Sequence, residues 1–381
     1  MITGIICEYN PFHKGHKKQI EIIRATDPDG VVVCLMSGNF VQRGSPALLD
    51  KALRAKAAIL CGADLVLELP VTYALRSAEG FADGGVSILK GFCDRLCFGA
   101  ENADGKKLTD TASILLSDDF ANALRQSLDS GKSFPAARQA ALTSLGVDTQ
   151  LVETPNNILA VEYCKAILRH GCNLQPMPIV REGNYHATEA DKNNPSATFI
   201  RNQMQENLDW ESYVPAEAAS CFRGATIHTL DVGETAILYR LRTMDDKQFS
   251  SLPFGSEGLW RKLMHASRQQ TDLNQIIEAT KSKRYTRTRL DRMVMCALLG
   301  ITREMLDAKA PYVRVLALNL RGREVLKLAR NAGTFPNIGE SMDDPFQNLE
   351  DHCRNIYGLF ANNKPEAAGL EKKYRIYYSE K

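Results

Sequence analysis

Two histidines, His13 and His16, flank Lys14 and Gly15 near the start of the chain. They follow a short apolar run, Ile2–Cys7, which predicts a buried strand, and they precede residues 17–25, which predict a helix. A strand-to-helix turn presents backbone N–H groups and the positive end of the helix dipole, and both favour an anion. The imidazoles would add side-chain donors, and the glycine lets a phosphate chain approach closely. This spacing suits nucleotidyl transfer, in which negative charge grows on the α-phosphate and on pyrophosphate.

The position of this turn in the chain favours chemistry over a plain surface loop. Two histidines so close together also arise by chance, and Pro11 and Phe12 could serve only as turn and core. The turn follows the first strand of a predicted parallel sheet, however. Open α/β sheets bind their ligands at the carboxyl ends of the strands.

A second polar cluster, Ser196, Thr198 and Arg201, follows the last strand predicted in the same domain. The two hydroxyls can cap a helix and bind phosphate oxygens, and the arginine adds a fixed cation. Alone, this pattern is most often a helix N-cap. Together with the histidine turn it indicates a site that holds a triphosphate from two sides.

The elements that must position these residues alternate between strand and helix over the first hundred residues. A continuous apolar run at residues 31–36 is typical of a sheet covered on both faces. The order of elements predicts an α/β fold with a Rossmann-like parallel sheet. Strands are predicted at residues 2–7, 31–36, 64–69, 95–98 and 176–180, and helices at residues 17–25, 51–61, 80–90 and 159–169.

The length of 381 residues suggests at least two domains. Residues 108–145 look largely helical and form an insertion or a cap over the nucleotide cleft. Beyond about Trp210 the strand signals fade, and helices are predicted at residues 216–221, 235–242, 259–266, 273–280 and 289–299. We therefore expect a nucleotidyltransferase-like, ATP-binding catalytic domain over residues 1–208, with a helical insertion at about 108–150, and a mostly α-helical domain over residues 209–381.

The composition limits the partners, metal sites and cellular location that we expect for the protein. Its net charge is only +2, so a nucleic-acid partner must be met by a local basic surface. Ten cysteines without a CxxC pair favour free thiols over a zinc site, and no metal-binding motif stands out. The N-terminus lacks a secretory signal and no apolar stretch reaches the length needed to cross a bilayer. We expect a cytoplasmic protein that does not enter the membrane; its oligomeric state stays open.

The stretch from residue 281 to residue 292 is the best candidate for contact with RNA. It holds six cations offset only by Asp291, with Tyr285 among them, and could follow a phosphate backbone and stack a base. The alternative is a solvated helix face. The residues that we expect to bind RNA are Lys281, Lys283, Arg284, Arg287 and Arg289.

The histidine turn and the Ser-x-Thr-x-x-Arg cluster resemble the nucleotidyltransferase superfamily that shares its core with class I aminoacyl-tRNA synthetases. Further segments are similar to one bacterial family, the tRNA(Met) cytidine acetate ligases, over nearly the whole chain. These segments are Glu8-Tyr9-Asn10-Pro11-Phe12-His13-Lys14-Gly15-His16, Met36-Ser37-Gly38-Asn39-Phe40-Val41-Gln42-Arg43-Gly44, Phe98-Gly99-Ala100-Glu101, Pro155-Asn156-Asn157-Ile158-Leu159 and Arg284-Tyr285-Thr286-Arg287.

The resemblance implies an enzyme that activates acetate with ATP to acetyl-adenylate and then acetylates the N4 amine of the wobble cytidine in elongator tRNA(Met). Mg²⁺ would accompany ATP, held mainly by the phosphates. His13 and His16 would stabilise charge as catalytic residues, and Gly99 would let the adenosine approach the backbone. Contacts with ATP are implied for Cys7, Glu8, Tyr9, Asn10, Pro11, Phe12, His13, Lys14, Gly15, His16, Lys17, Lys18, Gln19, Ile20, Gly99, Asn157, Arg181, Ser196, Thr198 and Arg201.

Other functions stay open at this point. One is adenylation of a small phosphorylated metabolite, which would have no need for a long helical domain bearing a basic segment. Another is an ATP-sensing RNA-binding module, in which the histidines would be dispensable. The segment that contains Gln42 and Arg43 is too polar for a core and could form part of an acetate pocket or a lid. The sequence identifies no general base for acetyl transfer.

Overall fold

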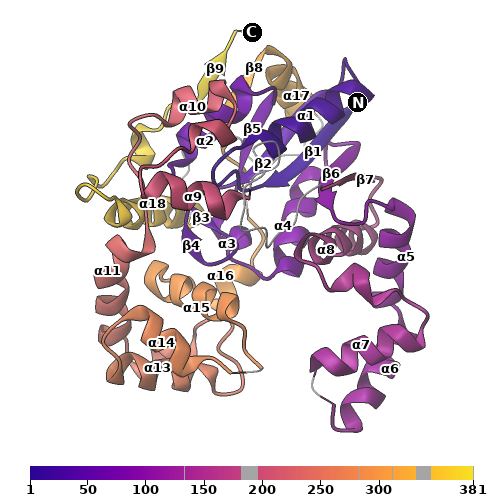
Figure 1. Ribbon diagram of the computed structural model, residues 1–381, viewed down its shortest axis with the longest axis vertical. Coiled ribbons are helices and arrows are strands. Elements are labelled where there is room, and N and C mark those ends of the chain that lie inside the picture. The colour runs from indigo at the N-terminus through magenta and orange to yellow at the C-terminus, as the bar shows by residue number, and fades with distance from the viewer. Residues whose placement is uncertain (133, 182–195, 283, 311, 332–344, 381) are drawn as a thin grey trace.

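The computed structural model describes the chain except for residues 133, 182–195, 283, 311, 332–344 and 381. Within the described residues, seven strands form one sheet in the order β7-β6-β1-β2-β5-β8-β9 (Figure 1). The first five strands of this order are parallel, as predicted, and β8 runs antiparallel to β5. The bounds are β1 Ile2–Cys7, β2 Val31–Ser37, β5 Leu65–Leu69, β6 Arg95–Ala100, β7 Gln175–Val180, β8 Val315–Asn319 and β9 Tyr377–Ser379. The predicted α/β class with a Rossmann-like parallel sheet is confirmed.

The strands β8 and β9 lie in the part of the chain that the sequence predicted to be mostly helical. Val315 to Leu318 are all buried, and the strand pairs with β5 from Leu65 to Leu67. The apolar run Val315–Leu318 is too short for its periodicity to separate strand from helix, so only the tertiary pairing defines it. Strand signals thus fade beyond residue 210 in the sequence, although two short strands follow in the structure. The domain boundary near residue 208 stays a prediction, but the sheet extends beyond it.

Helices cover both faces of the sheet. Alternate residues of β2 point to opposite sides: Val33 and Leu35 join one core, and Val32 and Cys34 join the other. This alternation explains why the strand is apolar throughout. The first core includes residues from α3 Val71–Ala74, α4 Ala78–Leu89, α5 Gly105–Leu115, α8 Pro155–His170 and α17 Leu320–Asn331; the second includes α1 Lys14–Thr26, α2 Lys51–Leu60, α9 Ala197–Gln205 and α10 Ala216–Phe222.

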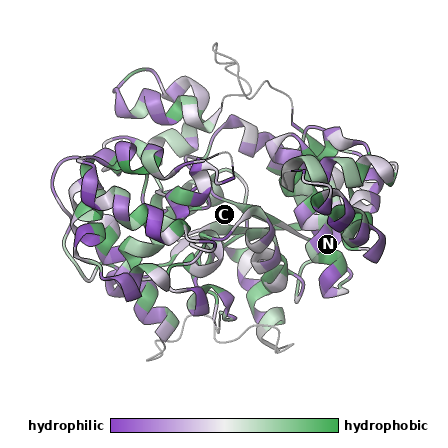
Figure 2. Ribbon diagram, turned by 90° about the horizontal axis from the view of Figure 1, so that it is seen from below, coloured by the Kyte–Doolittle hydropathy of each residue, from purple (hydrophilic) through white to green (hydrophobic). Residues whose placement is uncertain are grey.

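Two groups of helices extend from the sheet on opposite sides (Figure 1). The smaller one, α6 Asp118–Asp129 and α7 Phe134–Ser144, is the predicted helical insertion and has its own small core. The larger one, which we call the helical lobe, packs around a separate core. Its helices are α11 Leu230–Thr243, α12 Asp246–Ser250, α13 Leu259–Gln269, α14 Leu273–Thr280, α15 Arg287–Leu299, α16 Arg303–Asp307 and α18 Pro345–Tyr357. Figure 2 shows hydrophilic and hydrophobic residues alternating around these helices, as amphipathic packing requires.

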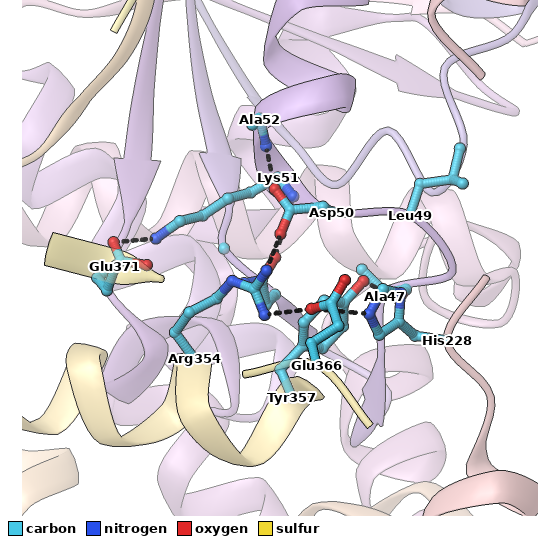
Figure 3. A network of polar contacts seen from close by, with 12 residues as sticks. Ala47, Leu49, Asp50, Lys51, Ala52, His228, Arg354, Tyr357, Glu366 and Glu371 are labelled. Carbon is cyan, nitrogen blue, oxygen red and sulfur yellow. Dashed lines mark hydrogen bonds and ion pairs between the residues drawn. The ribbon is translucent and has the colours of Figure 1, made fainter. Parts of the chain in front are cut away.

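A short hairpin, β3 Phe40–Val41 and β4 Ser45–Pro46, connects β2 to α2, and a polar network ties the chain after it to the C-terminal region (Figure 3). Arg354 on α18 lies 3.0 Å from a carboxylate oxygen of Asp50 and 2.8 Å from one of Glu366. Lys51 lies 2.7 Å from Glu371. Arg354, Lys51 and Glu371 are buried, so each of these charges depends on its partner. The network fixes the helical lobe against the start of α2.

All ten cysteines lie in the described part of the chain and are free, as predicted. In the same part of the chain we find no helix that is both long and apolar enough to cross a membrane.

Candidate active site

A cavity of about 800 Å³ opens at the carboxyl ends of β1 and β6. The chain leaves β1 toward β2 on one side and reaches β6 on the other, so the cavity sits at the topological switch point of the sheet, where α/β proteins bind ligands. Most of the predicted site residues come together here. The lining includes Cys7, Glu8, Tyr9, Asn10, His13, Gly15, His16, Lys18, Gln19, Gly99, Arg181, Ser196, Thr198 and Arg201, together with Gln42 and Arg43.

The histidine turn forms a capping box at the start of α1. His13 is the N-cap, and its Nδ1 accepts a hydrogen bond from the backbone N–H of Gly15 at 3.1 Å. Nδ1 of His16 accepts from the backbone N–H of His13 at 3.2 Å. A neutral imidazole that accepts through Nδ1 carries its proton on Nε2. Both rings can therefore donate through Nε2, and Nε2 of His13 is buried without a partner among the described residues.

Burial keeps these two rings neutral. Burial, with smaller contributions from the nearby Arg181 and Arg201, lowers the pKa of His13 to about 3. Burial also lowers the pKa of His16 well below its usual value, with His13 and Arg181 adding to the effect. The site thus separates two tasks: the histidines supply uncharged donors, and the arginines supply positive charge.

Arg201 joins the two predicted phosphate motifs. One of its guanidinium nitrogens donates to the backbone carbonyl of Asn10 at 2.9 Å, and the other donates to Oγ1 of Thr198 at 2.8 Å. Ser196 is the N-cap of α9, and its Oγ accepts from the backbone N–H of Phe199 at 3.1 Å. The N-termini of α1 and α9 consequently both border the cavity, which favours an anion between them.

Six of the residues predicted to contact ATP do not line the cavity. Pro11, Phe12 and Ile20 are buried and pack within the protein. Lys14 is the half-buried first residue of α1, and Lys17 forms an ion pair with Glu217 at 3.0 Å. Asn157 is also buried, and its Oδ1 accepts from the backbone N–H of Asn102 at 2.9 Å. The six predicted residues that lie outside the cavity lining are thus Pro11, Phe12, Lys14, Lys17, Ile20 and Asn157.

Asn156, one residue earlier on α8, lines the cavity instead. Its Oδ1 accepts from Arg181 at 2.9 Å, and its Nδ2 donates to Glu101 at 2.6 Å. The Glu101 carboxylate also accepts from Thr154 at 2.8 Å and from the backbone N–H of Asn157 at 2.7 Å, so it caps α8. Successive helix residues point about 100° apart, which is why only one asparagine of the pair can face the cavity. The sequence shows the two asparagines after Pro155, but it does not show which of them the helix turns toward the cavity.

Gly99 lines the cavity at the end of β6. A Cβ built on it would meet only side-chain atoms of Arg181, at 3.8 Å, an ordinary contact. Packing within the protein therefore does not require a glycine at this position.

The β3–β4 hairpin forms the wall of the cavity nearest the helical lobe. The backbone N–H of Gln42 donates to Glu8 at 2.7 Å. Gly44 has a φ of +80°, and a Cβ on it would collide with the backbone of Arg292 on α15. The hairpin thus lies directly between the cavity and α15.

The basic segment lies at the junction of α14 and α15. Lys281, Arg284 and Arg287 are exposed, and Arg284 pairs with Glu257 at 2.7 Å. Arg289 donates to the backbone carbonyl of Phe254 at 2.7 Å. Lys283 falls outside the described residues.

Tyr285 differs from the expectation for this segment. Its ring is only 9 % exposed and packs in the core of the helical lobe, and its hydroxyl donates to Glu257 at 2.8 Å. Burial leaves its ring face covered, so we no longer expect it to stack an RNA base.

The parallel sheet, the switch-point cavity and the two imidazole donors define a nucleotidyltransferase of the α/β class. A family model described as HIGH Nucleotidyl Transferase matches residues 1–372. Among curated proteins, the chain is 36% identical to the tRNA(Met) cytidine acetate ligase of Alkaliphilus metalliredigens over 97% of this chain and 96% of that protein. It is 37% identical to the enzyme of the same name from Clostridium kluyveri over 88% of each chain. The chain belongs to the tRNA(Met) cytidine acetate ligase family, as its motifs suggested.

Solved structures agree with this assignment. Thermotoga maritima TmcAL in its apo form superposes with a TM-score of 0.90 at 29% identity, covering 99% of this chain and all of that one. The same protein bound with alpha-thio ATP superposes with a TM-score of 0.87 at 28% identity over the same share of both chains.

Proposed function

We propose that this protein uses ATP to activate acetate as acetyl-adenylate and then acetylates the N4 amine of the wobble cytidine of elongator tRNA(Met). The observation that carries the proposal is the pair of neutral Nε2–H donors at the start of α1, opposite the arginine-bearing start of α9. The names of the related enzymes and the ATP analogue bound to the Thermotoga maritima protein support it.

In the first step an acetate oxygen attacks the α-phosphorus and pyrophosphate leaves. Negative charge then grows on the α-phosphate oxygens and on the leaving group. His13 and His16 would donate Nε2–H to these oxygens, and Arg201 and Arg181 would hold the triphosphate in place. Because the donors are fixed by the capping box before the substrate arrives, little reorganisation is needed.

ATP would occupy the cavity with its adenosine near Gly99, where the missing side chain leaves room for the base or sugar. Asn156, rather than Asn157, would contact the nucleotide together with Arg181. Mg²⁺ would enter with ATP and be held by phosphate oxygens, because Glu8 is the one carboxylate in the lining formed by the described residues.

In the second step the RNA must reach the acetyl group from outside. The β3–β4 hairpin joins the cavity wall to α15, and the exposed cations Lys281, Arg284 and Arg287 lie at the N-terminal end of this helix, where an RNA could be held while a base enters the cavity. Their partners are surface carboxylates, and exposed ion pairs are weak enough to be exchanged for phosphates. With a tRNA as the proposed substrate, we expect the reaction to take place in the cytoplasm.

Acetate-dependent exchange of labelled pyrophosphate into ATP tests the first step. We expect exchange with acetate alone, without RNA. Exchange that instead requires a phosphorylated metabolite would favour the alternative function. For the second step, Arg284→Glu with Arg287→Glu should weaken tRNA binding at least about 10-fold and make the remaining binding less dependent on salt, because fewer phosphate contacts release fewer counterions. The exchange reaction should be unchanged; equal loss of both would show that the segment is structural.

A further inference from the structure

Glu8 is a carboxylate in a cavity that is otherwise built for an anion. Among the described residues that line the cavity, the charged ones besides Glu8 are the cations Lys18, Arg43, Arg181 and Arg201. A carboxylate beside a triphosphate repels it, so Glu8 weakens ATP binding unless it performs another task there.

The position of Glu8 is fixed at the end of β1. Its Oε1 accepts from the backbone N–H of Gln42 at 2.7 Å, and its backbone carbonyl accepts from Arg54 at 2.6 Å. Arg54 is fully buried and also donates to the carbonyl of Ser37 at 3.2 Å. Oε2 of Glu8 has no hydrogen-bond partner among the described residues. One oxygen therefore holds the hairpin, and the other is available to a ligand.

The surroundings also suit proton transfer. Burial raises the pKa of Glu8, whereas the N–H of Gln42 and the cations Arg201, Arg43 and Arg54 lower it. Tyr163 also lines the cavity, and after burial and Cys7 the charge of Glu8 contributes to raising the pKa of its hydroxyl. An adenylate phosphate in the cavity would raise the pKa of Glu8 again, because it adds negative charge. A base whose pKa moves toward neutrality accepts a proton more effectively.

We propose that Oε2 of Glu8 is the base that accepts the proton released by the cytidine amine during acetyl transfer; this inference rests on the proposed function. The N4 nitrogen attacks the carbonyl carbon of acetyl-adenylate and a C–N bond forms. The C–O bond to the adenylate phosphate breaks, and AMP leaves with that electron pair. The proton lost by N4 passes to Glu8, which releases it to solvent afterwards.

Glu8→Gln separates this role from the structural one, because the amide oxygen still accepts from Gln42 while the side chain no longer takes up a proton. Acetyl-adenylate can be trapped by hydroxylamine as acetohydroxamate without RNA. We expect RNA acetylation to fall by about 100-fold or more, and by at least about 10-fold more than hydroxamate formation changes. In the wild type, single-turnover transfer to RNA should slow as the pH falls, and this acid limb should vanish in the variant.

Two further variants complete the test. Glu217→Gln removes a carboxylate outside the cavity and should change neither reaction. Glu8→Ala also removes the anchor of Gln42, so it should slow hydroxamate formation as well.

The outcomes are distinct. Wild-type protein that forms no hydroxamate from ATP and acetate would refute the proposed function itself. If Glu8→Gln loses hydroxamate formation as fully as RNA acetylation, the base assignment is overturned. A role of Glu8 in holding Mg²⁺ would give this result. RNA acetylation retained in Glu8→Gln, or no acid limb in the wild type, would also overturn it.

Discussion

The rings of His13 and His16 stack with their centroids 3.6 Å apart and an interplanar angle of 26°. Each ring uses Nδ1 to accept a backbone N–H of the same turn. The two side chains therefore build the start of α1 and at the same time aim their Nε2–H groups away from it. The same two rings therefore stabilise the start of α1 and supply the donors to the cavity, and replacing one ring removes the stacking partner of the other.

Replacing either histidine should slow adenylate formation strongly. Removal of one preorganised donor typically costs about 10²–10³-fold in rate. We expect His13→Ala and His16→Ala to lose acetate-dependent pyrophosphate exchange by that factor. His265→Ala, on the exposed side of α13, is the matched control and should keep full exchange. Wild-type exchange in both site variants would mean that the histidines are structural.

The burial of His13 predicts a pH dependence of stability. Its pKa in the fold is about 3, whereas a histidine in an unfolded chain titrates near ~6.5. Between these values the unfolded chain binds a proton that the fold does not. The stabilisation is complete above about pH 6.5 and is lost as the pH falls toward 3, at about 1.4 kcal/mol per pH unit.

Urea unfolding measured at several pH values across this window checks the prediction. His13→Asn retains a side-chain acceptor at the N-cap but does not titrate, so its stability should depend less steeply on pH. The same slope in variant and wild type would show that His13 is protonated in the fold.

Glu101→Gln should weaken ATP binding and should also lower the stability by about 1 kcal/mol, because it removes the charged acceptor that caps α8. The variant loses the charged acceptor that fixes Asn156, and Asn156 in turn fixes Arg181. We expect the KM for ATP to rise about 10-fold, from the loss of charge-assisted hydrogen bonds, with a smaller change in kcat. Glu153→Gln, at an exposed position before α8, serves as the control. A fall in kcat alone would argue against a positioning role.

Arg354→Met should destabilise the fold. It leaves the partly buried carboxylates of Asp50 and Glu366 without their cation, at a cost of about 2–4 kcal/mol. Arg223→Met removes an exposed ion pair with Glu211 and should cost less than about 1 kcal/mol. Thermal unfolding of the two variants compares them directly, and similar small shifts would show that the network in Figure 3 is not stabilising.

The sequence predicted the sheet and the phosphate turn because both depend on local patterns. Continuous apolar runs marked the central strands, and the spacing of His13, Gly15 and His16 marked the turn. The short strands β8 and β9 were missed because they are defined by pairing with distant residues such as Leu65.

Within the site, the differences between the predicted residues and the cavity lining come from side-chain orientation. Asn156 and Asn157 carry the same side chain, and only the phase of α8 decides that Asn156 faces the cavity. Lys17 looked like a phosphate ligand, but it reaches Glu217 on α10, far away in sequence. Tyr285 looked exposed among cations, yet the core of the helical lobe encloses its ring. Such placements follow from tertiary packing, which residue spacing does not encode.

The most direct test of the account supplies the protein with ATP, radiolabelled acetate and unmodified elongator tRNA(Met). We predict that label appears on N4 of the wobble cytidine and that one AMP and one pyrophosphate form for each acetyl group transferred. His13→Ala should abolish the label within the same assay. Absence of label with acetate, together with labelling from acetyl-coenzyme A, would contradict the adenylate mechanism.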